Sequence, residues 1–346
     1  MCGSTSVVEE KGNKMKSTEG SDRKPIVSVC IPSFNYGKYI SEAIDSVLNQ
    51  SLKEFELVIV DDCSTDNSKE VISRFSDSRI RFYENETNIG MTKNWNKCVK
   101  LSRGEFICIL GADDYVHPEF LEKCVRSVGS NSRVGFVYSA FERVKDNREK
   151  IDTFRLSDID FIESGSKAFR RFAKRNVVML SSALIRKDCF ESLGDFDEHL
   201  GYAPDIEMFA RIATRYDVSY ISEVLGYYRL HKDNLTKVFG KTGQMVDEII
   251  MTVDKMISDI PDNSDLMDLR QDADVMKANY ISGAMYVWAL YGDLKGTRKN
   301  ILMILSLDHQ RILDLRVIGV FLLSFLGWKV TTLVIQKIWL AKYAFS

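Results

Sequence analysis

Apolar and polar positions follow a regular pattern along the first 110 residues of the chain. Four short runs rich in β-branched and aromatic residues have the length and composition of β-strands. They lie at 26–32, 55–60, 79–85 and 106–110. The stretches between them, in which apolar residues recur at helical spacing, are 37–51, 61–75 and 91–102. This alternation predicts an α/β fold, in which helices cover a mostly parallel sheet.

Polar clusters follow three of the four predicted strands. They read PSFN at 32–35, DDCSTD at 61–66 and GADD at 111–114. Ligands of open α/β sheets bind beyond the carboxyl ends of the strands, so we expect the three clusters to converge on one crevice. The first strand is not followed by GxGxxG, and the chain has no GxxxxGK followed by Ser or Thr, so both of these phosphate cradles are excluded.

Asp113 and Asp114 are adjacent carboxylates that follow the apolar run 106–110. Like charges repel and resist burial, so a chain that brings two of them to the rim of a core often uses them to hold a cation. A divalent metal held there would neutralise a diphosphate. A turn or a helix cap is the alternative interpretation of the same pair.

The composition restricts the classes of partner and compartment. The 346 residues are 45% hydrophobic, as is typical of a globular protein, and the formal net charge of −2 predicts no nucleic-acid partner. Seven cysteines are scattered without a CxxC or zinc-like spacing, which favours a reducing compartment. Residues 1–24 lack an apolar signal-peptide core and are rich in Ser, Gly, Lys and Glu, which predicts a flexible leader.

Four ordered motifs extend these observations to a known family. They are VSVCIPSFNYGKYISEAIDSVLNQSLKEFELVIVDDCSTDNS at 27–68, NIGMTKNWNKCVKLSRGEFICILGADDYVHPEFL at 88–121, LGDFDEHLGYAPDIEMFARIA at 193–213 and YYRLHKDNLT at 227–236. Together they resemble the inverting family 2 glycosyltransferases with the GT-A fold. The resemblance implies a GT-A domain over 25–236. Beyond it, the hydrophobic pattern predicts a helical region over 237–310 and a basic, apolar helix over 311–346.

The resemblance also implies where the nucleotide-sugar donor binds. The residues expected to line the nucleotide pocket are Pro32, Ser33, Phe34 and Asn35. Asp62 aligns with the carboxylate that accepts a hydrogen bond from the base, although a turn or N-cap role is its alternative. Asn96 belongs to the segment that the resemblance places near the donor.

The Asp-x-Asp motif of the family falls on Gly111, Ala112 and Asp113, so only its last aspartate is present. By resemblance, Ala112 and Asp113 lie at the donor, and Asp113 is a ligand of Mn²⁺ or Mg²⁺. Asp114 is expected either to bind the same metal or to orient Asp113. His231 aligns with a histidine that meets the metal or the diphosphate, and a structural loop histidine is its alternative.

Asp205 is the candidate catalytic residue. The spacing of apolar residues after it predicts that Asp205 lies near a helix N-terminus, where the helix dipole favours the ionised carboxylate. The resemblance implies that it is the general base of an inverting transferase. A capping role is the alternative, and Pro204 stands where the family usually has Glu.

The function expected from the resemblance is transfer of a sugar, of the hexosyl or N-acetylhexosaminyl class, from a nucleotide-diphosphate donor. A UDP-sugar is the expected donor, and a hydroxyl of a glycan or lipid-linked acceptor in cell-surface polysaccharide synthesis is the expected acceptor. Two other classes stay open, a sugar-phosphate nucleotidyltransferase and a non-catalytic sugar- or lipid-binding module. The first would need a Gly-rich basic loop after the first strand, which the chain lacks.

The C-terminal segment suggests a membrane surface. The apolar run 317–328 is too short to span a bilayer, and residues 311–346 contain five basic residues against Asp314 alone. Trp328 and Trp339 are suited to an interface. We therefore expect a cytoplasmic protein that is peripheral at the inner face of the cell membrane, with a buried terminal helix or a dimer face as alternatives.

Overall fold

The computed structural model describes residues 24–231, 234, 245–262, 264–290, 294–326, 330–331 and 334–335. The alternation predicted for the first 110 residues is confirmed. Its strands are β1 (Val27–Ser33), β2 (Phe55–Asp61), β3 (Ile80–Glu84) and β4 (Phe106–Ile109). Its helices are α1 (Ile40–Leu48), α2 (Ser68–Ser73) and α3 (Met91–Leu101).

Residues 115–230 add elements of which the sequence pattern predicted only the helix after Asp205. The strands are β5 (Tyr115–Val116), β6 (Val134–Lys145), β7 (Lys150–Phe154), β8 (Phe161–Glu163), β9 (Ala183–Arg186) and β10 (Asp217–Leu230). The helices are α4 (Phe120–Val128), α5 (Gly165–Phe172), the 3₁₀ turn η1 (Leu180–Ser182), α6 (Lys187–Leu193) and α7 (Pro204–Ala213). The first seven residues of β6 are all buried, so this strand shows no alternation of apolar and polar positions.

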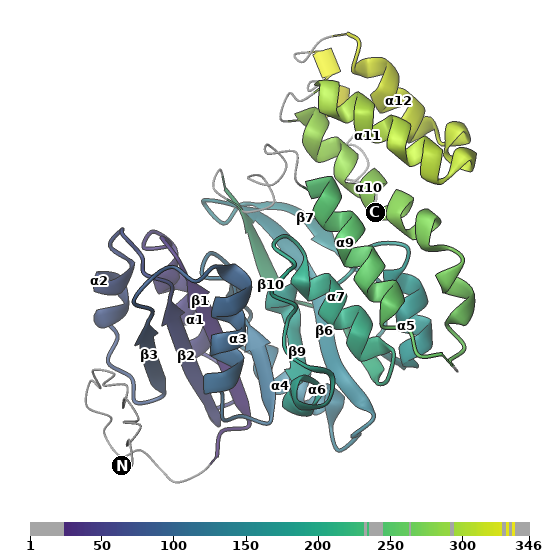
Figure 1. Cartoon of the computed structure of the whole chain (residues 1–346). Helices are drawn as coiled ribbons and strands as arrows, with labels where there is room; N and C mark the ends of the chain where they lie inside the picture. Colours follow the sequence, from purple (N-terminus) through teal and green to yellow (C-terminus); the bar gives the residue numbers. More distant parts are fainter. Residues whose placement is uncertain are drawn as a thin grey trace, which may run out of the picture.

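Within the described residues, the strands form one ten-stranded sheet (Figure 1). Its order is β3-β2-β1-β4-β9-β6-β10-β5, with β7 paired to β6 and β8 to β10. The pairs β1–β2, β1–β4, β2–β3 and β6–β10 are parallel, whereas β9 is antiparallel to both β4 and β6. The carboxyl ends of β1, β2 and β4 therefore meet at one edge, as the sequence predicted, and the mixed, mostly parallel sheet flanked by helices is the expected GT-A-like fold.

The two faces of β1 pack against different helices. Val29 and Ile31 are buried in the cluster that contains α1 and α4, whereas Cys30 belongs to the cluster that contains α3. Burial on both faces explains the continuous apolar sequence of β1.

The helical region after the sheet consists of α9 (Met245–Ser258), the 3₁₀ turn η2 (Met267–Arg270), α10 (Ala273–Leu290), α11 (Leu294–Leu307), the 3₁₀ turn η3 (His309–Leu313) and α12 (Leu315–Leu323). Helices α9, α10 and α11 lie within 237–310, where the sequence predicted a helical region. Figure 1 shows α5, α7 and α9 side by side on one face of the sheet, with α10, α11 and α12 beyond them. Met245, Ile281 and Ile304 belong to the same buried cluster as Phe136 of β6, so the core is continuous across the boundary expected at 236.

The C-terminal segment differs in part from the expected single helix. Helix α12 ends at Leu323, and Val320 on its inner side is buried in the main cluster. Trp328 and Trp339, which the membrane hypothesis used, lie outside the described residues. None of the helices in the part of the chain that the structure describes has the length and apolar character needed to cross a membrane.

Candidate functional site

The loops after β1 and β2 are tied together by Asn35. Its backbone has a positive φ of 60°, and its N–H donates to Oγ of Ser64 at 2.8 Å. Its side-chain oxygen accepts from the backbone N–H of Thr65 at 2.8 Å and of Asp66 at 3.3 Å. Asparagine tolerates this left-handed conformation better than most residues. Asn35 therefore shapes the predicted nucleotide loop, and a direct contact with the donor stays a prediction.

The neighbouring residues Pro32, Ser33 and Phe34 lie at the end of β1, as the sequence predicted. Phe34 is 42% exposed, which leaves its ring available to a base or sugar. Ser33 is buried, and no hydrogen-bond partner for its Oγ exists among the described residues. An unsatisfied buried hydroxyl costs about 1–3 kcal/mol, so a polar group of a ligand at this position would stabilise the site.

Asp62 is buried and organises the loop after β3. Its Oδ1 accepts from Asn85 Nδ2 at 2.7 Å and from the N–H of Ile89 at 2.9 Å, and its Oδ2 accepts from the N–H of Gly90 at 2.9 Å. Gly90 has a φ of 89°, a conformation that glycine adopts readily. A carboxylate has about four acceptor positions, so Asp62 retains one for the base contact that the resemblance implies.

Asn96 has a different environment from the one expected. Its Nδ2 donates to the carbonyl of Phe196 at 2.9 Å and to Glu198 Oε1 at 3.1 Å, and its Oδ1 accepts from the N–H of Phe196 at 3.0 Å. The side chain is buried and both of its N–H groups are used. Asn96 thus holds the loop that leads to Asp205, and this geometry does not favour the predicted contact with the donor.

Asp113 and His231 come together at the predicted metal position. Nε2 of His231 lies 2.8 Å from Oδ2 of Asp113, and Asn234 Nδ2 donates to the same oxygen at 3.3 Å. The backbone N–H of His231 donates to Asn234 Oδ1 at 2.6 Å. Sequence reasoning missed Asn234, although its position three residues after His231 in HKDN was the available signal.

The His231 ring is also held by aromatic neighbours from the segment just before α1. Its centroid lies 4.6 Å from that of Tyr39 and 6.1 Å from that of Tyr36, which it meets edge-on. These contacts link the end of β10 to the predicted nucleotide loop. A rigid imidazole next to a carboxylate is a suitable ligand pair for a metal.

Asp114 lies behind the site in a buried position. Its Oδ2 accepts from Ser181 Oγ at 2.6 Å, and its Oδ1 accepts from the backbone N–H of Arg229 at 3.0 Å. Burial raises the pKa of Asp114 well above its usual range, and the neighbouring charge of Asp113 adds to this shift. Both oxygens are therefore used to join η1 to β10, which favours the orienting role over direct metal binding.

Gly111 and Ala112 complete the turn. Ala112 is buried, so its methyl group contributes packing. A Cβ at position 111 would lie 3.0 Å from a carboxylate oxygen of Asp113 and 3.0 Å from one of Asp114. The turn thus has little room for the first aspartate of the family motif, because its Cβ would press on both carboxylates.

Arg229 is buried and supports the turn that carries Asp113. Its side chain is 2% exposed. Nε donates to the carbonyl of Asp113 at 2.8 Å, Nη1 to the carbonyl of Asp146 at 2.8 Å, and Nη2 to Glu42 Oε2 at 2.6 Å. Arg229 therefore connects three parts of the chain: the turn that contains Asp113, helix α1 and the β6–β7 hairpin.

Asp205 lies in the first turn of α7, as the sequence predicted. Burial raises its pKa to about 6, and backbone N–H groups of Ile206 and of Asp205 itself partly oppose this shift. Burial raises the pKa of Tyr280 of α10, and the charge of Asp205 adds to this shift. The Tyr280 hydroxyl donates to the carbonyl of Phe172 at 2.6 Å. Helix α10 therefore contributes to the low-dielectric surroundings of the candidate base.

The connectivity brings Asp205 to the edge of the sheet where Asp113 lies. Helix α7 packs on β6 through Phe209, whose ring centroid is 4.8 Å from that of Phe136, and then connects directly to β10. Because β10 runs back across the sheet and ends at Leu230, just before His231, the N-terminus of α7 and the end of β10 lie toward the same edge. The fold thus directs the candidate base and the candidate metal pair toward the same edge of the sheet.

Glu207 and Arg211 form a buried ion pair that sequence reasoning missed. The Arg211 guanidinium donates to Glu207 at 2.8 and 3.0 Å and to the carbonyls of Leu193 and Asp195. Burial raises the pKa of Glu207 to about 7, with Asp259 of the loop after α9 adding to the shift and Arg211 opposing it. The spacing of four residues on a helix was the available signal. The pair anchors the start of the loop that ends at Asp205.

The donor set at Asp113 and His231 fits Mn²⁺ or Mg²⁺. Two adjacent ligands of an octahedral ion with bonds of about 2.1 Å lie about 3.0 Å apart, close to the 2.8 Å between Nε2 and Oδ2. No cluster of three or more His, Cys, Asp or Glu side chains that could hold a metal occurs in the described ranges. Mg²⁺ commonly uses one or two carboxylates and obtains its other ligands from phosphates and water.

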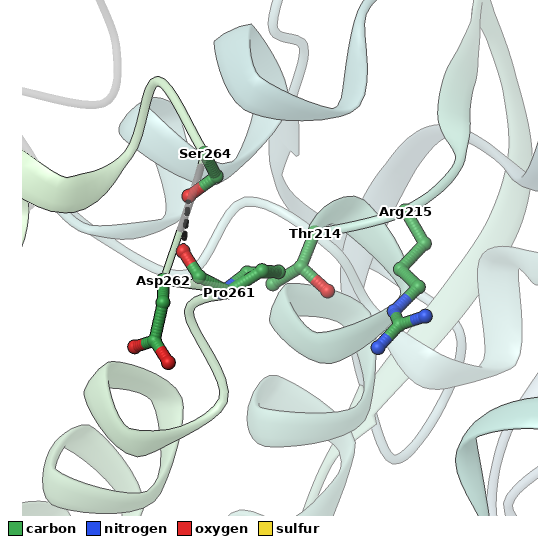
Figure 2. Close-up of a pocket in the computed structure, with 5 residues that line it drawn as sticks. All are labelled: Thr214, Arg215, Pro261, Asp262 and Ser264. Atoms are coloured by element: carbon green, nitrogen blue, oxygen red, sulfur yellow. Dashed lines mark hydrogen bonds between the residues drawn. The ribbon is translucent and has the colours of Figure 1, made fainter.

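A surface pocket lies away from these residues. It is lined by Thr214, Arg215, Pro261, Asp262 and Ser264, and the Ser264 hydroxyl donates to the carbonyl of Pro261 at 2.9 Å (Figure 2). Thr214 follows the last residue of α7, whereas Asp205 lies in its first turn, about 14 Å along the helix. The pocket is open and contains one basic and one acidic side chain, so it is not the candidate active site.

Comparison with known sequences identifies relatives of this chain. Residues 28–194 match the family model described as glycosyl transferase family 2. An uncharacterized glycosyltransferase of Methanocaldococcus jannaschii is 31% identical over 221 residues, which are 62% of this chain and 74% of that protein. Hyaluronan synthase of Pasteurella multocida is 26% identical over 229 residues, which are 62% of this chain but only 21% of that much longer enzyme.

Solved structures share the fold. S. aureus TarS in complex with UDP-GlcNAc superposes with a TM-score of 0.60 at 17% identity, covering 90% of this chain and 91% of that one. The mannosyltransferase PcManGT of Pyrobaculum calidifontis, in complex with GDP-Man and Mn²⁺, gives a TM-score of 0.56 at 16% identity and covers 90% and 88% of the two chains. At these identities the likeness concerns the fold alone.

Proposed function

The chain belongs to glycosyl transferase family 2, and from this premise we propose that it is an inverting, metal-dependent transferase that uses a nucleotide-diphosphate sugar. The donor we propose is a UDP-sugar of the hexosyl or N-acetylhexosaminyl class. The acceptor is a hydroxyl of a glycan or of a lipid-linked glycan in cell-surface polysaccharide synthesis. The UDP-GlcNAc complex of TarS and the similarity to hyaluronan synthase support this choice. The PcManGT complex with GDP-Man and Mn²⁺ supports a metal and a nucleotide-diphosphate sugar, without favouring uridine.

The observation that carries the proposal is the pairing of Asp113 with His231 at the carboxyl ends of the strands, on the edge toward which Asp205 is directed. We propose that Asp113 and His231 hold Mn²⁺ or Mg²⁺ and that Asp114 and Asn234 orient them. When bound, the ion would neutralise negative charge on the nucleoside diphosphate. We propose that Asp205 accepts the proton of the acceptor hydroxyl.

In the proposed reaction, an acceptor hydroxyl attacks the anomeric carbon from the face opposite the leaving diphosphate. Asp205 takes the hydroxyl proton as the new glycosidic bond forms and the bond to the diphosphate breaks. A pKa of about 6 suits this role, because the carboxylate is ionised at neutral pH yet basic enough to accept a proton. A single displacement inverts the anomeric configuration.

The remaining site roles are proposed from position. Ser33, Phe34 and Asn35 lie beside the nucleotide, with Pro32 ending the strand beneath them, and Asp62 reads the base with its remaining acceptor position. The buried Ser33 hydroxyl is suited to a hydrogen bond with the donor. We propose that the protein acts at the cytoplasmic face of the membrane, where a lipid-linked acceptor is available.

The test is to incubate the protein with a panel of sugar nucleotides, with Mn²⁺, Mg²⁺ or EDTA, and to measure nucleoside diphosphate release. We expect the unmodified protein to release UDP from a UDP-sugar in a metal-dependent reaction. The Asp205→Asn variant should not catalyse this release. Release of pyrophosphate from a nucleoside triphosphate and a sugar phosphate would instead identify a nucleotidyltransferase. Binding of sugars without any turnover would identify a non-catalytic module.

A further inference from the structure

One face of α11 carries basic side chains followed by an apolar one. Lys295, Lys299 and Leu302 are spaced by four and three residues, so they lie on the same side of the helix, and all three are exposed. Ile301 and Ile304 of the same helix are buried in the main core. Leu302 is 57% exposed, which is a large apolar exposure for a helix with one side in the core.

The outer face of α12 and the turn after it are apolar. Leu315, Leu322 and Phe325 lie at intervals of seven and three residues on one side, and their exposed fractions are 82%, 61% and 62%. Leu326 next to them is also exposed. Val317 and Val320 face the core instead. Large apolar side chains gathered at one place on a surface often mark an interaction site.

Arg298 joins these two faces into one surface. Its guanidinium lies over the ring of Phe325, 4.8 Å from the centroid, and its Nη1 donates to the carbonyl of Ser324 at 2.9 Å. Because Arg298 lies between Lys295 and Lys299 on α11, the basic residues are next to the apolar end of α12. We call this the α11–α12 surface, which comprises Lys295, Lys299, Leu302, Leu315, Leu322 and Phe325.

The charges of this surface have one sign. Helices α11 and α12 contain no Asp or Glu. Among the described residues that flank these helices in the chain, Asp308 and Asp314 are paired with Arg311 and Arg316, and the hydrogen bond from Arg316 lowers the pKa of Asp314 to about 2. Asp293, which precedes α11 in the sequence, lies outside the described residues. Figure 1 shows α11 and α12 at the opposite end of the molecule from β3.

We propose that the α11–α12 surface docks on an anionic lipid membrane. Exposed apolar side chains would enter the boundary between headgroups and acyl chains, while Lys295, Arg298 and Lys299 would contact lipid phosphates. This proposal rests on the proposed function, because a membrane-bound transferase would meet a lipid-linked acceptor there. It differs from the sequence prediction, since the basic residues belong to α11 and not to 311–346. A second copy of the chain is a poorer occupant, since a two-fold contact of this surface with itself would bring basic residues near one another.

The test uses the full-length protein and vesicles of phosphatidylcholine, with or without phosphatidylglycerol, in co-sedimentation at low and high salt. We expect binding to the anionic vesicles that salt weakens. Lys295→Gln with Lys299→Gln should lower the partition coefficient about 30-fold, the effect of two interfacial charges. The matched control, Lys53→Gln with Lys174→Gln, removes two exposed charges elsewhere and should leave binding unchanged.

A second pair of variants tests the apolar part. Leu322→Ser with Phe325→Ser should reduce binding while thermal unfolding shows a folded protein. Sedimentation equilibrium without vesicles tests whether a second copy of the chain occupies the surface. The proposal would be overturned if the unmodified protein is a dimer that these substitutions dissociate and if it does not bind vesicles. Equal effects of the control pair and the Lys295 and Lys299 pair would also overturn it. Donor turnover measured without vesicles reports on the transferase function separately, because it does not need this surface.

Discussion

Nε2 of His231 lies 2.8 Å from Oδ2 of Asp113, although the two residues are 118 positions apart in the chain. Asp113 follows the end of β4 and His231 follows the end of β10. The contact is maintained from both sides, since Arg229 donates to the carbonyl of Asp113 and Asn234 donates to its side chain. This relationship supports the proposed metal position, and it makes the roles of the adjacent residues testable.

Asp205→Asn should abolish most turnover without changing donor affinity, because the amide keeps the shape of the carboxylate but cannot accept the proton. We expect kcat to fall by roughly 10²- to 10⁴-fold, the usual contribution of a general base. Since the base is active when ionised, kcat/KM of the unmodified protein should rise with pH through about 6, the pKa to which burial raises Asp205. Rapid kinetics with a fixed donor would measure both effects. A variant with near-normal kcat would remove Asp205 from the mechanism.

Asp113→Asn and Asp114→Asn should have separable effects. The first should weaken Mn²⁺-dependent donor binding by at least about tenfold, because a metal ligand is lost. In the second, the amide oxygen can still accept from the Arg229 N–H, but the N–H₂ group no longer accepts from the Ser181 hydroxyl, which must rotate. This loss should lower the free energy of unfolding by about 1 kcal/mol. Calorimetry and urea denaturation distinguish these outcomes. If only Asp114→Asn loses metal binding, Asp114 and not Asp113 is the metal ligand.

His231→Gln tests whether the imidazole binds the metal or only supports the loop. As a ligand, its loss should weaken donor binding in Mn²⁺ but have no effect on binding in EDTA. Asn234→Ala removes the partner of the His231 backbone N–H and serves as the control for loop structure. If both variants lower the melting temperature equally and neither changes the metal dependence, the role of His231 is structural.

Glu207→Gln should make stability less dependent on pH. Burial raises the pKa of Glu207 above its unfolded value, so between about pH 4.5 and 7 the folded state binds more protons than the unfolded state. The free energy of unfolding contributed by this group therefore falls as pH rises through that window, by up to about 3 kcal/mol. Urea denaturation from pH 5 to 8 would measure the slope. Glu191→Gln, at an exposed position of α6, is the matched control and should retain the slope of the unmodified protein.

Gly111→Ala should impair the site through crowding. The new Cβ would lie 3.0 Å from a carboxylate oxygen of each neighbouring aspartate, so at least one must move. We expect weaker metal-dependent donor binding in a protein that stays folded. Gly283→Ala, whose Cβ meets nothing within 4 Å in α10, is the control and should stabilise the helix by about 1 kcal/mol. Unchanged donor affinity in Gly111→Ala would mean that the turn can adjust.

The sequence by itself determined the alternating strands and helices of the first 110 residues, and the motifs that resemble the family indicated the candidate residues. Strands such as β1 are short apolar runs buried between helices, and the helices α1 and α3 show clear spacing, so local periodicity was sufficient. The position of Asp205 at a helix start followed from the apolar spacing after it. These features depend on residues within about ten positions of one another, a range over which sequence patterns report structure directly.

Only the tertiary structure decided how the candidate residues are used. The local pattern does not distinguish Asp113 from Asp114. In the structure, Ser181 and the backbone of Arg229 bind Asp114, whereas His231 contacts Asp113. Asn96 contacts Phe196, 100 positions away, and the surroundings of Asp205 depend on Tyr280 of a distant helix. The physical reason is that the order of strands in the sheet, which no local pattern encodes, determines which chain ends meet. Burial at those meeting points then fixes which carboxylate is hydrogen-bonded, which is charged and which is left to bind a ligand.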